Sequence, residues 1–241
     1  MHLSIVIPAF NEEKLLPATL TAVAEAAAAL AEKDITHDVI VCDNNSTDRT
    51  SEIARARGAA VIFEPVNQIS RARNAGATLA KGEWLLFLDA DSTPSRELFA
   101  DLARVLFDDS VLYGGCMVVL DEPKRLGQIF VDFWHRIAKW NQWAAGSFLF
   151  VRREAFETTG GFSTELYASE ELELSKRLKR IAKQRTQRFV FLTDHPLVTS
   201  ARKFRFHSNW SHLRFLLRTI FCGTRNLRRR EACGLWYDGK R

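Results

Sequence analysis

Short, continuous apolar runs alternate with longer helix-forming stretches along the first ninety residues of the chain. The apolar runs predict strands at residues 3–7, 38–42, 60–63 and 84–88. The stretches between them predict helices at residues 14–31, 46–57 and 69–80. Strands that are apolar along their whole length, with helices between them, are typical of a parallel sheet covered on both faces. The pattern therefore predicts an α/β fold, and we expect Gly76 to allow one helix to pack closely on the sheet.

Polar clusters follow three of these strands at the point where each one ends. They occupy residues 8–13, 43–48 and 89–91. Ligands of parallel α/β sheets bind beyond the carboxyl ends of the strands, where such clusters come together. The sequence therefore predicts a ligand site at this edge of the sheet.

Asp89 and Asp91 form the sharpest of these clusters because they directly follow the apolar strand WLLFL. Residues i and i+2 of an extended chain point to the same side, so the two carboxylates share a side and Ala90 faces away. Paired carboxylate oxygens suit Mg²⁺ or Mn²⁺, with a diphosphate completing the coordination shell. The alternative is that the two aspartates only help to begin the next helix.

Composition and charge narrow the class of protein. The chain has 241 residues, 46% of them hydrophobic and 26% charged, which is ordinary for a folded globular protein. Its four cysteines contain no CxxC pair, so neither a zinc ribbon nor a dithiol redox site is expected. With no apolar run of about 20 residues and no basic, signal-like N-terminus, a cytoplasmic protein is expected.

The net charge of +5 is unevenly distributed. Residues 1–201 carry 23 Lys and Arg against 27 Asp and Glu, whereas residues 202–241 carry 11 against two. Such a basic segment favours an anionic partner, namely nucleic acid, a phosphate-bearing substrate or an acidic membrane surface. Aromatic and basic residues also recur at helical spacing at 130–140 and 210–220. These helices could face the core, or they could lie on anionic lipid and receive a lipid-linked acceptor.

The order of several motifs resembles family 2 glycosyltransferases, which have the GT-A fold. The motifs are PAFNEE, VCDNNSTDRT, ARNAGATLAKGEWLLFLDADS, GSFLFVRREAFETTGGF and SEELELSKRL, spread over residues 3–180. The resemblance implies a GT-A α/β/α sandwich with a mostly parallel sheet at residues 1–200, divided into a nucleotide-binding half at 1–91 and an acceptor half at 92–200. Residues 201–241 would be a basic amphipathic helical extension packed on that domain.

The resemblance also implies an activity and a set of site residues. Such enzymes transfer a sugar, with inversion, from a nucleotide diphosphate donor to an acceptor hydroxyl, using Mn²⁺ or Mg²⁺. Asp89 and Asp91 would serve the metal and the diphosphate, and Asp43 would face the base. The nucleotide-binding set is Pro8, Phe10, Asn11, Glu12, Asp43, Ser46, Arg73, Asp89, Ala90 and Arg202. His195 is a candidate third metal ligand, or otherwise a surface hydrogen-bonding residue.

Glu170 and Glu171 begin a helix and are the candidate catalytic bases. Glu171, Leu174 and Leu178 share one helical face, so we expect Glu171 to point toward the protein body and Glu170 to lie nearer the flank. Burial would raise the pKa of Glu171 and make it the better base for an acceptor hydroxyl. The family usually has Glu followed by Asp here, so the second glutamate is a departure and either residue could be the base.

Other classes fit less well. No GxGxxG or GxxxxGK[ST] motif is present, which excludes a dinucleotide oxidoreductase and a P-loop NTPase. A metal-dependent nucleotidyltransferase, or a protein that binds nucleic acid or an anionic surface through its basic segment, remains an alternative. Carboxylates at the strand ends would repel phosphates, so no specific nucleic acid is expected. The processive-synthase sequence QxxRW is missing, which favours transfer of a single sugar, with UDP favoured over GDP as the carrier.

Overall fold

The structure is a computed structural model that describes residues 1–121, 135–202, 227–228 and 230–233. Within this part of the chain, one sheet has eight strands in the order β3-β2-β1-β4-β7-β6-β8-β5. The strands are β1 His2–Ala9, β2 Thr36–Asp43, β3 Ala60–Phe63, β4 Trp84–Leu88, β5 Ser92–Thr93, β6 Val111–Leu120, β7 Phe148–Arg152 and β8 Arg188–Thr199.

Strand direction divides the sheet into two parts. β3, β2, β1 and β4 are all parallel, with Ile5 of β1 opposite Val39 of β2 and Leu86 of β4. β7 then runs antiparallel to both β4 and β6, and β8 runs parallel to β6. The parallel part places the ends of β1, β2 and β4 along one edge, as the sequence predicts.

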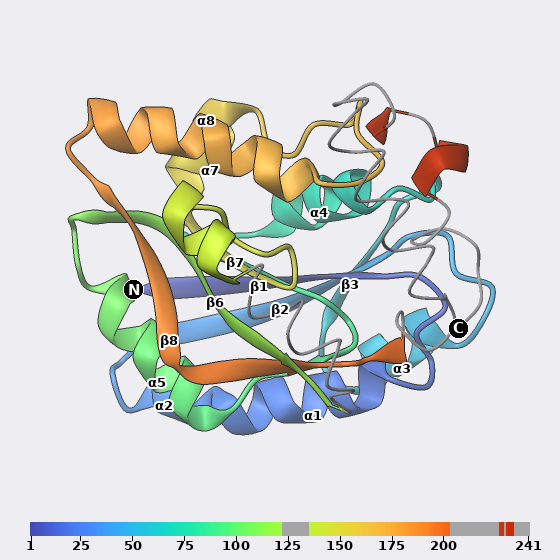
Figure 1. Ribbon diagram of the computed structural model, residues 1–241. Coiled ribbons are helices and arrows are strands. Elements are labelled where there is room, and N and C mark those ends of the chain that lie inside the picture. The colour runs from blue at the N-terminus through green and yellow to red at the C-terminus, as the bar shows by residue number, and fades with distance from the viewer. Residues whose placement is uncertain (122–134, 203–226, 229, 234–241) are drawn as a thin grey trace.

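Helices cover both faces of the sheet (Figure 1). On one face lie α1 Leu16–Ala26, α2 Ala28–Ala31, α3 Thr50–Ala56 and α5 Arg96–Leu106. On the other lie α4 Ile69–Leu79, α7 Arg153–Thr159 and α8 Glu170–Gln184. The predicted α/β/α sandwich is confirmed.

Strand β1 is buried on both faces, which explains why its sequence is apolar without alternation. Ile5 and Ile7 pack into the core beneath α1, whereas Val6 packs into the core on the opposite face. Val6 lies so close to α4 that a Cβ added to Gly76 would be 2.4 Å from Val6 Cγ1. Gly76 therefore permits close packing of α4 on the sheet, as expected.

Two helices begin later in the structure than the sequence predicts. The helix predicted at 14–31 starts at Leu16, with Pro17 in its first turn, and is divided into α1 and α2. The helix predicted at 46–57 starts only at Thr50, because the Ser46 hydroxyl accepts a hydrogen bond from Asn11 N, 2.9 Å away, within a loop. In the part of the chain that the structure describes, no helix is long and apolar enough to cross a membrane.

Most of the predicted basic extension, and the aromatic positions at 130–134 and 210–220, lie outside the described residues. The few described residues beyond 202 contact the loop that precedes α8. Leu227 and Cys233 are buried against Leu166 and Ala168. Tyr167 N donates to Leu227 O at 2.7 Å.

Candidate active site

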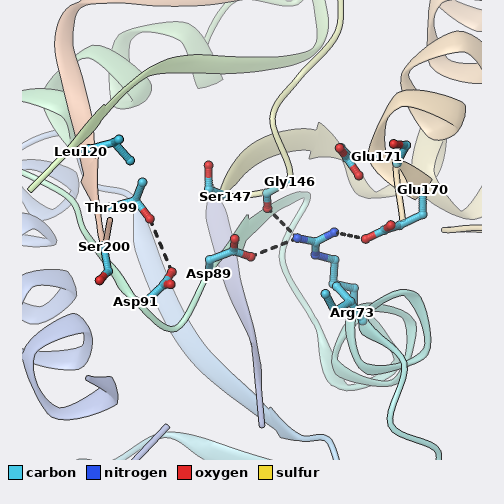
Figure 2. A pocket seen from close by; sticks show the side chains of 12 residues that line it. Arg73, Asp89, Asp91, Leu120, Gly146, Ser147, Glu170, Glu171, Thr199 and Ser200 are labelled. Carbon is cyan, nitrogen blue, oxygen red and sulfur yellow. Dashed lines mark hydrogen bonds and ion pairs between the residues drawn. The ribbon is translucent and has the colours of Figure 1, made fainter. Parts of the chain in front are cut away.

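A pocket of about 220 Å³ opens at the carboxyl end of β4 (Figure 2). It is bordered by α4, by the loop before β7, by the first turn of α8 and by the end of β8. The lining residues are Ile69, Arg73, Asp89, Asp91, Leu120, Gly146, Ser147, Ser169, Glu170, Glu171, Thr199 and Ser200. Elements far apart in the sequence thus meet at the predicted edge of the sheet.

Arg73 of α4 is the central cation of this pocket. It is 3% exposed and lies between two carboxylates: its Nη1 is 2.7 Å from Glu170 Oε1 and its Nη2 is 3.0 Å from Asp89 Oδ1. Nη2 also donates to Gly146 O at 2.9 Å, and the guanidinium lies over the Phe162 ring. Burial alone would lower the pKa of Arg73, but the charges of Asp89, Glu170 and Glu171 raise it above its ordinary value. Arg73 therefore joins the end of β4 to the first turn of α8.

Glu170 and Glu171 occupy positions opposite to those expected. Glu170 is buried, at 4% exposed, whereas Glu171 is only partly buried and borders the pocket. The buried stripe of α8 includes Glu170, Leu174 and Leu178, which are four residues apart. The expectation that Glu170 lies nearer the flank was wrong because it took no account of Arg73, which neutralises Glu170 inside the protein.

The pKa of Glu171, which borders the pocket, is raised toward neutrality. Burial, and then the nearby charge of Glu170, raise its pKa from 4.5 to about 8, while Arg73 acts in the opposite direction. A carboxylate whose pKa is near the working pH accepts a proton more readily from a hydroxyl group. The environment of Glu171 is thus suited to general-base chemistry.

Asp89 and Asp91 both face the pocket, and Ala90 between them is buried in the core, as the alternation predicts. Asp91 Oδ1 is 3.4 Å from Thr199 Oγ1, and its Oδ2 is 3.6 Å from Arg202 Nη2. Among the described residues, no group of three or more His, Cys, Asp or Glu side chains could hold a metal ion. The two aspartates nevertheless fit Mg²⁺ or Mn²⁺, because such ions commonly bind one or two carboxylates and take further ligands from phosphates and water.

Glu12 and Arg202, both predicted to bind the donor, contact each other. The guanidinium makes a bidentate pair, with Nη2 2.8 Å from Glu12 Oε1 and Nη1 3.1 Å from Oε2. Both side chains are largely buried, and the carboxylate charges raise the pKa of Arg202 against the effect of burial. The pair connects the loop after β1 to the segment that follows β8, next to Asp91.

The other predicted nucleotide-binding residues lie at the ends of β1 and β2 and in the loops that follow, and they do not border this pocket. Asp43 is buried, and its carboxylate accepts hydrogen bonds from Ser46 N, at 2.9 Å, and from Ser51 Oγ. Asn11 adopts a left-handed backbone, with φ of 53°, and its side-chain Oδ1 accepts from Thr47 N at 2.8 Å. These bonds hold the loops after β1 and β2 together. Pro8 lies in β1 opposite Cys42, and Phe10 is partly buried.

His195 is not brought together with the two aspartates. It is 45% exposed, and its Nδ1 lies 2.9 Å from Asp101 Oδ2 of α5. It does not border the pocket. The family resemblance makes His195 a candidate metal ligand, but the structure pairs it with α5, the helix that packs on β8.

Sequence reasoning assigned no role to several residues that border the pocket. Gly146 is the clearest case, since a Cβ there would lie 2.7 Å from Arg73 Nη2. Gly146 and Ser147 begin the motif GSFLF, which was recognised only as part of a family pattern. Thr199 and Ser200 carried no sequence signal, because their place depends on the pairing of β8 with β5, where Thr199 lies opposite Ser92.

The sandwich and its strand-end pocket define a GT-A type fold, which known structures share. TarS of Staphylococcus aureus aligns with a TM-score of 0.64 at 17% identity, covering 98% of this chain and 69% of that one. Glucosyl-3-phosphoglycerate synthase of Mycobacterium tuberculosis, in complex with Mn²⁺, UDP and glucosyl-3-phosphoglycerate, aligns with a TM-score of 0.60 at 18% identity, covering 96% and 80%. At these identities the likeness shows the fold.

The sequence itself shows the family. The model of glycosyl transferase family 2 matches residues 4–160, more than half of the chain, which therefore belongs to this family. An uncharacterised glycosyltransferase of Mycobacterium bovis is 37% identical over 90 residues, which cover 37% of this chain and 37% of that protein. One of Haemophilus influenzae is 26% identical over 189 residues, covering 73% and 61%. The chain thus spans about two fifths of the first of these relatives and three fifths of the second.

Proposed function

We propose that this chain transfers a single sugar, with inversion, from a nucleotide diphosphate donor to an acceptor hydroxyl, with UDP preferred to GDP. The observation that carries the proposal is the meeting of Asp89, Asp91 and Glu171 in one pocket at the strand ends. Membership of glycosyl transferase family 2 favours sugar transfer over nucleotidyl transfer. UDP, UDP-GlcNAc and Mn²⁺ in the structures of proteins with the same fold support a UDP-sugar donor and a divalent ion.

In this proposal the acceptor hydroxyl attacks the sugar on one side, next to Glu171, and the diphosphate leaves on the other. Glu171 accepts the proton of the acceptor hydroxyl while the hydroxyl oxygen forms a bond to the anomeric carbon of the sugar. The bond from that carbon to the diphosphate oxygen breaks on the opposite side, and the nucleoside diphosphate leaves with the electron pair. Attack and departure on opposite faces invert the anomeric configuration.

Asp89 and Asp91 would hold the divalent ion, which stabilises the growing negative charge of the leaving diphosphate when it is bound. Arg202 lies beside Asp91 and could add a bidentate contact to a phosphate. The pocket, at about 220 Å³, is smaller than the roughly 300 Å³ at which ligand pockets begin. We therefore assign it to the sugar and the diphosphate, with the nucleoside along the loops that carry Phe10 and Asp43.

The test is calorimetric titration of the chain with UDP, GDP and ADP, each with Mn²⁺ and with a chelator. We expect micromolar binding of UDP only with the metal, and its loss in Asp91→Asn. Asp194→Asn is the matched control, because Asp194 is an exposed aspartate on β8 that does not border the pocket. Glu171→Gln should keep UDP binding and lose sugar transfer. Equal UDP binding in the chelator would contradict the metal role, and an active Glu171→Gln enzyme would contradict the base role.

A further inference from the structure

In the described part of the chain, one face carries basic side chains that form no ion pair with another described residue. They lie on the helix at residues 135–141 and on α8, and all are exposed. The six are Arg136, Lys139, Lys176, Lys179, Arg180 and Lys183, called here the basic face. None of the six forms an ion pair with another residue in the described ranges.

The spacing places these residues together on each helix. On α8 the four basic positions are separated by three, one and three residues, which is one helical face. The two helices are also in contact. Lys176 Nζ lies 5.8 Å from the centre of the Trp143 ring, and Lys179 Nζ is 3.4 Å from Asn141 O. The helix at residues 135–141, drawn in yellow-green, therefore lies beside α8 (Figure 1).

Neighbouring basic residues of the same region are neutralised, which makes the basic face distinct. Arg177 pairs with Glu173, Arg185 with Glu154 and Arg188 with Asp108. α5, on the far side of the sheet, mixes both signs of charge in one sequence, RELFADLARVL. Among the described helices, only the six residues of the basic face thus form an exposed group of charges of one sign.

An exposed aromatic residue accompanies the charge. Trp140 is 87% exposed and lies between Lys139 and Asn141 at the end of its helix. An indole ring has an apolar body and a polar N–H, so it is favoured at the boundary between lipid and water.

We propose that the basic face binds the surface of an anionic lipid bilayer, with Trp140 at the headgroup level. Clusters of four to eight Lys and Arg on a helix bind acidic lipids, each contributing about 1 kcal/mol near the surface. Four of the six are lysines, compact charges that suit a diffuse layer of headgroups, whereas paired phosphate recognition favours arginine. Lys176 lies five residues from Glu171, about 8 Å along the helix axis, so a bilayer bound here would be close to the pocket.

The experiment is flotation of the full chain with phosphatidylcholine vesicles, with and without phosphatidylserine. We expect binding only to the phosphatidylserine vesicles, and its loss at high salt. The variant Lys179→Glu with Lys183→Glu should bind at least tenfold more weakly. The matched control is Lys33→Glu with Arg55→Glu, which makes the same change of net charge at exposed positions on other helices and loops and should bind like the parent. Trp140→Ala should bind more weakly, whereas Phe107→Ala, which removes a half-exposed ring directly after α5, should not.

Several results would overturn the proposal. Equal binding to both kinds of vesicle, or equal weakening by both double variants, would show that the basic face has no specific part. Unchanged binding of Lys179→Glu with Lys183→Glu would move the site to the basic sequence at 203–226. Tight binding to single-stranded RNA that only this variant loses would identify nucleic acid as the partner. Flotation uses no donor, so its outcome is separate from that of the UDP titration, and circular dichroism confirms that each variant is folded.

Discussion

The raised pKa of Glu171 should make the stability of the fold depend on pH in a defined direction. The pKa of Glu171 is about 8 in the folded chain, against an ordinary value of 4.5. Between these values the folded state holds a proton that the unfolded state has released. Stability therefore falls as the pH rises from 4.5 through 8, because the unfolded state then binds fewer protons than the folded one.

The size of this effect follows from the same two values. Each tenfold change in the ionisation equilibrium corresponds to about 1.36 kcal/mol, so the whole interval from 4.5 to about 8 amounts to at most about 5 kcal/mol. Glu171 borders the pocket and keeps some contact with water, which reduces the penalty on its charged form. We expect a loss of about 2–3 kcal/mol between pH 5 and pH 8 from this residue.

Urea unfolding of Glu171→Gln and of the parent chain at pH 5, 6, 7 and 8 measures the effect. The glutamine has nearly the same shape and cannot ionise, so the variant should be about as stable as the parent at pH 5 and more stable at pH 8. The matched control is Glu173→Gln, which alters a carboxylate of the same helical turn that pairs with Arg177 near the surface. Parallel curves for the parent and Glu171→Gln at all four pH values would refute the reasoning.

Further predictions concern the core and the edge of the site. Arg73→Met should lower the free energy of unfolding by about 3–5 kcal/mol, because it leaves the buried Glu170 and the partly buried Asp89 without their cation. Arg49→Met, which removes an exposed ion pair with Glu52, should cost about 1 kcal/mol or less in the same urea assay. Gly76→Ala should cost about 1–3 kcal/mol, since the added methyl meets Val6, and a loss below 0.5 kcal/mol would contradict that contact. His195→Ala should leave Mn²⁺-dependent UDP binding unchanged by calorimetry, because the histidine pairs with α5 outside the pocket.

The parallel part of the fold was predictable because its signals are local. Residues 84–88 are buried on both faces and therefore apolar without interruption. β6 gave no such signal, since Gly114 and Gly115 interrupt its apolar run in the way that a turn would. In the structure a Cβ at Gly114 would lie 2.2 Å from the Phe150 ring of the adjacent strand. The glycine is explained by a neighbour 36 positions further along the chain, which a local pattern does not reveal.

In the candidate site, too, the residues set by local patterns were predictable and those set by distant contacts were not. Asp89 and Asp91 were found because alternation along one strand fixes where their side chains point. The reversal of Glu170 and Glu171 was missed because it depends on Arg73, 97 residues earlier in the sequence. The spacing of apolar residues on α8 is compatible with either glutamate facing inward, and only the buried cation decides between them. The ion pair between Glu12 and Arg202 joins residues 190 positions apart, and the sequence pattern did not predict it either.

The balance of charge around the pocket bears on how a donor could bind there. Five carboxylates, those of Glu12, Asp89, Asp91, Glu170 and Glu171, surround the guanidinium groups of Arg73 and Arg202. Both arginines already pair with these carboxylates, so the site as folded has an excess of negative charge beside the place proposed for a diphosphate. Below about pH 8 the raised pKa of Glu171 removes part of this excess, because the carboxyl then retains a proton that it must release before it can act as the base. A divalent cation at Asp89 and Asp91 would remove the rest, and this is the physical reason for expecting the metal and the nucleotide to bind together.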